Sequence, residues 1–365
     1  MQSSIDAEWM AFACGENTMM ETKSKTKESI SIPINIPDAS PLHLCTKTII
    51  AYINVDDKLD LDELFWDIPI IPYGIPKEGI IKKQIQVTSR NAEHVENVQN
   101  KYDSITIKKN KHVVIHVTDK DKHCKFKHVE KIDIGISKQD VLSTRKKKIK
   151  QKAFFNCFTM VFRVYCYKKE FKEIHVKLFN TGKLEIPGIT DDVILFQTLD
   201  LLVSILKPLI RQRSLLEYSK KFDNVLINMK FNAGYNIKRE KVYELMRNKY
   251  NIIASYESTG YPGVKCKFYY NKNKVKQNGH CECDILCEKS KSSSNPKSCK
   301  EISFMIFRTG NILILGHSNI DIFYEIYDFL KRILKDEYTI IHEPNNTTLV
   351  KENKVCVKKK TIFIS

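Results

Sequence analysis

The sequence has no long apolar run, little glycine and no recognisable catalytic motif. No stretch reaches the roughly 18 consecutive apolar residues of a transmembrane helix, so we expect no membrane span. Residues 1–20 carry Asp6 and Glu8 and lack both a basic start and an apolar core, so we expect no secretion signal. Glycine occurs only 12 times, and no phosphate-binding glycine loop or nucleophile motif is present. We therefore expect that the protein is not an enzyme.

The composition is strongly basic. The net charge is +17, from 60 Lys and Arg against 43 Asp and Glu. Such a surplus favours a polyanionic partner, nucleic acid before membrane. An AT-rich coding sequence also produces Lys-rich loops, so the charge is supporting evidence only. In the intracellular protein that we expect, the 11 Cys are free thiols or metal ligands rather than disulfides.

One strand–turn–strand pattern occurs twice and organises the chain. Residues 174–188 and 302–316 align so that Phe179, Gly182 and Gly188 match Phe307, Gly310 and Gly316. Each copy predicts a hairpin with a tight turn at Thr-Gly, followed by an apolar helix. In the first helix we expect Val193 and Phe196 on the buried face. Two copies are too few for a solenoid and indicate one domain built from two similar halves.

The remaining segments divide the chain by composition. We expect a disordered tail, a domain of two repeats with one insertion in each, and a basic, strand-like tail. The ranges are 1–40 for the first tail, 41–338 for the domain, 42–208 for the first repeat with insertion 89–152, 222–338 for the second repeat with the Cys-rich insertion 271–300, and 339–365 for the last tail.

The first insertion is polar and rich in Lys and His. Its basic run 145–152 contacts phosphates, acts as a nuclear import signal, or is a solvated loop. One strand is expected, at 113–117. The histidines, among them His116 and His128, match no metal-binding spacing, and we expect them at the surface.

The order of elements resembles the TATA-box-binding protein family, and most of all its diverged members in large nucleocytoplasmic DNA viruses. The second half carries the resemblance in Asn224, Tyr256-Glu257, Tyr261-Pro262-Gly263, Ile306-Phe307 and Gly310 to Gly316. The first half carries it in Thr48-Ile49-Ile50, Lys58-Leu59-Asp60-Leu61, Phe155 and Leu178 to Lys183. The likeness covers residues 42–75 and 153–338.

The resemblance implies an α+β fold, in which a pseudo-two-fold saddle of curved antiparallel sheet carries helices on its convex face. Its concave face binds and bends duplex DNA in the minor groove. By position, the aromatic side chains that wedge between base pairs are Phe155 and Phe179, and Tyr261 and Phe307. The alternative is that all four lie in the core, as strand aromatics commonly do.

The resemblance also assigns the centre and floor of this surface. Asn224 and Thr48 occupy the two central positions, and Leu313 and Leu315 lie on the floor. The family has Asn at both centres, so Thr48 is a departure. In the first half Glu185 and Pro187 replace the usual floor residues, and a carboxylate there opposes reading of a TATA element.

Four cysteines in the second insertion form a candidate metal site. Cys281, Cys283, Cys287 and Cys299 lie close enough in sequence for one structural zinc ion, although the spacing is not that of a standard finger. His280 could replace one cysteine, and free thiols are the alternative.

These features lead to a hypothesis of a viral transcription initiation factor. Its partners would be double-stranded DNA and, from the resemblance, a B-type initiation factor and RNA polymerase, with no membrane partner. It would act in the nucleus or in a cytoplasmic viral factory. The alternatives are a DNA-bending or packaging protein without promoter selection, and a zinc-stapled protein-interaction module.

Overall fold

The computed structural model describes residues 35–117, 126–142, 156–167, 169–211, 214–257, 259–283, 287 and 299–344. Pro37–Ser365 forms one compact unit, separate from Met1–Ile36. Ala39 packs against the core and the amide of Ser40 donates to the carbonyl of Asn232, so ordered contacts begin a few residues before residue 41.

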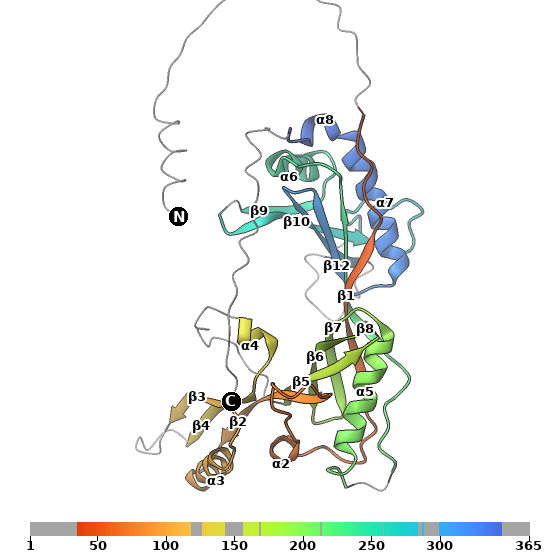
Figure 1. Cartoon of the computed structure of the whole chain (residues 1–365). Helices are drawn as coiled ribbons and strands as arrows, with labels where there is room; N and C mark the ends of the chain where they lie inside the picture. The colour runs from red at the N-terminus through yellow and green to blue at the C-terminus, as the bar shows by residue number, and fades with distance from the viewer. Residues whose placement is uncertain are drawn as a thin grey trace, which may run out of the picture. The chain divides into compact units, whose positions relative to one another are not determined.

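Two halves of the chain contain the same succession of elements (Figure 1). The first half comprises β1 (His43–Tyr52), α2 (Leu61–Asp67), β2 (Gly79–Ser89), β5 (Cys157–Cys166), β6 (Glu170–Phe179), β7 (Lys183–Ile189) and α5 (Asp192–Leu206). The second half comprises β8 (Asp223–Asn232), α6 (Arg239–Asn248), β9 (Ile253–Glu257), β10 (Tyr261–Tyr270), β11 (Lys300–Phe307), β12 (Asn311–Gly316) and α7 (Ile320–Asp336). The short helix α8 (Tyr338–Ile341) follows, where a strand-like tail was expected, and Ile341 is buried.

All the strands in the described part of the chain belong to one 12-stranded sheet, in the order β3-β4-β2-β5-β6-β7-β1-β8-β12-β11-β10-β9. Strands β1 and β8 pair antiparallel at the junction of the halves, and from there the order in each half is equivalent. The expected α+β class with a mostly antiparallel sheet is confirmed, and the two organising hairpins lie in the same sheet.

The two hairpin turns explain why the sequence repeats there. Gly182 and Gly310 both have φ of +76°, and their amides donate to the carbonyls of Phe179 and Phe307 over 3.0 Å. A Cβ would lie 2.5 Å from the carbonyl oxygen of Ile53 at Gly182 and 2.2 Å from that of Tyr235 at Gly310. Only glycine fits both the dihedral angle and the close backbone.

Each half has its own core on the helix-bearing side of the sheet. In the first half, α2 and α5 pack against β2, β5 and β7, and in the second, α6 packs against β9 and β10 while α7 joins the same core. Helix α5 begins at the N-cap Asp191, whose carboxylate accepts from the amide of Val193. Its buried face is Ile194, Leu195, Thr198, Leu199, Leu202 and Leu206, so Val193 and Phe196 are exposed, contrary to expectation.

The segment between β2 and β5 is more ordered than its composition predicts. It forms α3 (Ala92–Asp103), β3 (Lys109–Val117), β4 (Lys127–Gly135) and α4 (Lys138–Leu142). His128 is buried, against expectation, because β4 lies between β2 and β3. Its Nδ1 lies 2.8 Å from that of the exposed His116, and its Nε2 lies 3.5 Å from the buried Glu130. The basic run 145–152 lies outside the described residues.

Helix α4 is held on the sheet face opposite the helical cores by two carboxylates, its own Asp140 and Glu173 of β6, which accepts from the amide of Lys138. Asp140 pairs with Lys82 over 2.7 Å and accepts from the hydroxyl of Ser137 over 2.6 Å. Burial raises the pKa of Asp140, but the hydrogen bonds from Lys82 and Ser137 outweigh it and hold the pKa well below its ordinary value.

The substitution Asp140→Asn is expected to lower the free energy of unfolding by about 1–3 kcal/mol at neutral pH. Because the folded-state pKa is depressed, this contribution is complete above about pH 4 and declines as pH falls further. Urea unfolding of both proteins at pH 7 and pH 3 measures it. A difference that stays constant or grows at pH 3 would contradict the assignment.

Candidate nucleic-acid interface and metal centre

The sheet face opposite α2, α5, α6 and α7 is the candidate binding surface, and we call it the open face. It is defined by strand alternation. On β6 and β7, Leu178, Leu184 and Ile186 enter the core, and the residues between them point the other way. On β11 and β12 the same alternation applies. Half-buried open-face residues include Thr48, Lys177, Phe179, Glu185, Pro187, Asn228, Ser303, Met305, Phe307, Leu313 and Leu315.

In the second half the structure brings Tyr261 and Phe307 together. Their ring centroids are 6.1 Å apart, with planes inclined at 56°. Gly263 lies directly opposite Phe307, and a Cβ there would come within 3.0 Å of the Phe307 ring and 3.1 Å of the Tyr261 ring. The missing side chain therefore leaves room for both rings. The Nζ of Lys265 lies 4.2 Å from the Tyr261 ring centroid, so a cation stands against this pair of aromatic rings.

In the first half Phe179 occupies the equivalent position. Cys157 lies opposite Phe179, as Gly263 lies opposite Phe307. The Nζ of Lys183 is 5.4 Å from the Phe179 centroid. Phe155 lies outside the described residues. It precedes Cys157 by the same interval that separates Tyr261 from Gly263, so the register supports matching these two positions.

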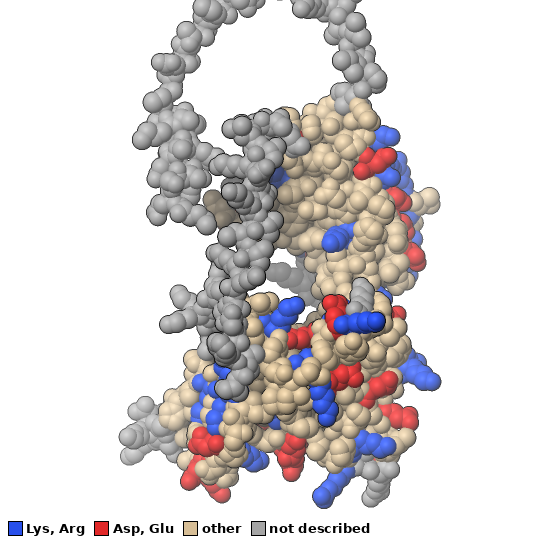
Figure 2. Space-filling view, in the orientation of Figure 1, with Lys and Arg blue, Asp and Glu red and all other residues tan. Residues whose placement is uncertain are grey.

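The floor of the open face differs between the halves. In the second half the cross-strand pair Met305 and Leu313 is apolar, and Leu315 lies beside it on β12. In the first half the same pair is Lys177 and Glu185, and the Lys177 Nζ lies 2.6 Å from the Glu185 Oε1. In the view of Figure 2, charges of both signs are interspersed over the first half, whereas those of the second half gather on the side of α7.

At the centre of the sheet, Thr48 and Asn224 are not brought together. Thr48 pairs with Leu226, and a register shift then places Asn224 opposite Ile49, whose side chain is in the first core. Asn224 therefore leaves the open face and lines a cavity of about 660 Å³ that also contacts Ile320 of α7.

The central polar pair is instead Thr46 and Asn228, which sequence reasoning missed. The Asn228 Nδ2 donates to the Thr46 Oγ1 over 3.0 Å, and both lie on the open face. The available signal was alternation, because Asn228 is a polar residue between the buried Ile227 and Met229. The irregularity of the pairing is not visible in the sequence.

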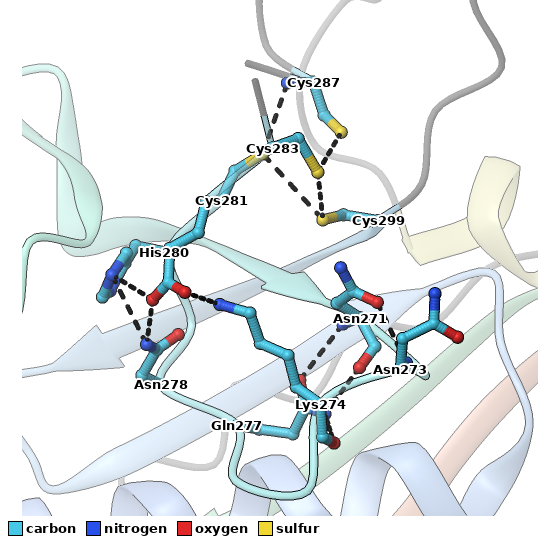
Figure 3. Close-up of polar contacts among 11 residues, drawn as sticks. Asn271, Asn273, Lys274, Gln277, Asn278, His280, Cys281, Cys283, Cys287 and Cys299 are labelled. Carbon is cyan, nitrogen blue, oxygen red and sulfur yellow. Dashed lines mark hydrogen bonds and ion pairs between the residues drawn. The ribbon is translucent and has the colours of Figure 1, made fainter. Parts of the chain in front are cut away.

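The four predicted metal ligands converge. The sulfur atoms of Cys281, Cys283, Cys287 and Cys299 all lie within 4.8 Å of one another (Figure 3). Cys283 Sγ is 3.6 Å from Cys299 Sγ and 3.8 Å from Cys287 Sγ, and Cys281 Sγ is 3.9 Å from Cys299 Sγ. Tetrahedral zinc with bonds of about 2.3 Å separates its sulfurs by about 3.8 Å. This geometry fits a closed four-thiolate metal site, and the sulfurs are farther apart than the roughly 2.0 Å of a disulfide bond.

Backbone donors and a polar network support the cluster. Burial raises the pKa of Cys281, but backbone amides of Cys287 and Cys283 outweigh it and lower the pKa to about 7, which favours the thiolate ligand. Nearby, Glu282 contacts Lys274 and His280, so His280 points to a carboxylate rather than to the sulfurs (Figure 3). The cluster packs on Tyr269 at the end of β10.

No protein-family model matches this sequence, and no curated protein matches it. Among solved structures, the chain is similar to Methanococcus jannaschii TBP, with 10% sequence identity and a TM-score of 0.37, over 82% of this chain and 99% of that chain. Among the described helices, none is both long and apolar enough to span a bilayer.

Proposed function

We propose that this protein binds duplex DNA in the minor groove with its open face and bends it. The observation that carries the proposal is the equivalent placement of Phe179 and Phe307. Each ends the corresponding strand of its half and is half-buried on a face free of the main helices. Lys183 lies against the Phe179 ring, and Lys265 lies against Tyr261, the ring beside Phe307. A planar aromatic side chain at such a place can replace the stacking lost when a base step opens. The lysines and the net charge of +17 favour the phosphates.

The sequence motifs support the TATA-box-binding class and, within it, the diverged viral members. The protein would then be a non-catalytic initiation factor whose curved saddle marks viral promoters, in the nucleus or in a cytoplasmic viral factory. Glu257, exposed at the end of β9, is where a B-type initiation factor would contact it, followed by RNA polymerase. In this proposal the cysteine cluster holds one structural zinc ion, with no open coordination position for chemistry.

A bending assay tests the function directly. We expect full-length protein to bring together the ends of a doubly dye-labelled duplex, measured by energy transfer at moderate salt. At equal protein concentration, bending should be several-fold greater on AT-rich than on GC-rich duplex. The minor groove of A·T pairs lacks the guanine amino group, so the apolar floor residues can contact it. Equal bending of both would favour a packaging protein, and no duplex binding at all would favour a protein-interaction module.

A further inference from the structure

The two halves carry chemically different cross-strand pairs at equivalent positions on the floor of the open face. Gly182 and Gly310 fix the alignment of the two hairpins, so Lys177 and Glu185 occupy the positions of Met305 and Leu313. The side chains of Lys177 and Glu185 are 24% and 29% exposed, which leaves both within reach of a ligand on this face.

The ion pair cancels the charge repulsion that a carboxylate in this place would otherwise exert on DNA. Alone, Glu185 would repel DNA, but the Lys177 ammonium lies 2.6 Å from its Oε1 and neutralises it. The contact engages Oε1, and a carboxylate has a second oxygen, Oε2, whose lone pairs can accept a further hydrogen bond. An acceptor is selective in the minor groove, because A·T pairs present only acceptors there and G·C pairs add the N2 amino donor of guanine.

We propose that Glu185 accepts a hydrogen bond from the guanine N2 amino group, so that the first half selects a G·C pair while the second half selects A·T pairs. Leu313 and Leu315 have no acceptor to offer, so a guanine amino group against them would lose its hydrogen bonds to water, and the second half disfavours guanine. The binding site is therefore directional, and the protein binds it in one orientation. This inference rests on the proposed minor-groove binding.

Inosine provides the test, because an inosine·C pair lacks only the N2 amino group. Sites are first selected from a random duplex library with full-length protein, and we expect an A·T run on one side and a required G·C pair on the other. Replacing that guanine by inosine should weaken binding of the wild-type protein about tenfold, as expected for one charge-assisted hydrogen bond.

The matched variant is the double substitution Lys177→Met and Glu185→Leu, which copies the pair of the second half. It should lose the discrimination between guanine and inosine and select A·T pairs on both sides, with an unchanged melting temperature. Equal wild-type affinity for guanine and inosine, or a variant that keeps the preference, would overturn the inference while leaving minor-groove binding intact. Failure to bind any duplex would instead overturn the proposed function.

Discussion

Purified full-length protein is expected to contain one equivalent of zinc, and chelation is expected to unfold the region between β10 and β11. Structural zinc sites of four thiolates contribute on the order of 10 kcal/mol to local folding. The cysteines pack with Tyr269 in a cluster that shares no residue with the two main cores, so its loss should leave those cores folded. Metal analysis, thiol titration and hydrogen exchange of residues 277–283 measure these effects.

The substitution Cys287→Ser should have the same effect as chelation, since it removes one of the four sulfurs. Cys45→Ser is the matched control, because Cys45 is partly exposed on β1 and lies outside the cluster. We expect the control to retain its zinc. A protein with far less than one equivalent of metal, and with hydrogen exchange unaffected by chelator, would show that the cysteines are free thiols.

The substitution Phe307→Ala is expected to weaken DNA binding by about 1–3 kcal/mol, the value of one base-stacking contact, with a proportionate loss of bending. Its neighbour Phe304 is the control, because it lies on the same strand, is fully buried and faces the core. Phe304→Ala should cost about 3–5 kcal/mol of folding stability. Melting temperature and DNA affinity, measured side by side, separate the two roles.

Phe179→Ala should reduce DNA binding less than Phe307→Ala does. Around Phe179 the floor of the open face is Lys177, Glu185 and Pro187, which offers less apolar contact than Met305 and Leu315. Equal losses from both variants would remove the asymmetry between the halves. A large fall in melting temperature for Phe307→Ala would assign that ring to the core and end its role as a wedge.

The repeated hairpins and the main helices could be predicted because local signals agree there. The Thr-Gly turns require a positive φ, the flanking strands alternate, and α7 buries the expected residues Ile322, Ile326 and Ile333. The four cysteines could be predicted as a group for a similar reason, since thiols close in sequence need only one loop to converge. In each case the information lies within a few residues.

The predictions that were wrong concern features that depend on contacts between distant segments. Helix α5 is apolar on most sides, so periodicity did not fix which side faces the sheet, and Phe196 contacts Phe222 at the surface instead. The polar strand β4 is buried because β2 and β3 flank it. The displacement of Asn224 arises from a register shift between β1 and β8, which no single strand encodes.

Strand β3 is an edge strand of the sheet, which has a consequence for the behaviour of the protein in solution. This strand exposes Val113, Val114 and Ile115, and its far side pairs with no other described strand. An exposed edge strand can pair with strands of other molecules and so start aggregation. Two features oppose this. The register of the pairing with β4 shifts between Val113 and Ile115, and Lys109 together with the net charge of +17 repels a second molecule, although Lys111 is paired with Glu130. Concentrated protein should therefore stay soluble longest at low ionic strength, where these charges repel most strongly.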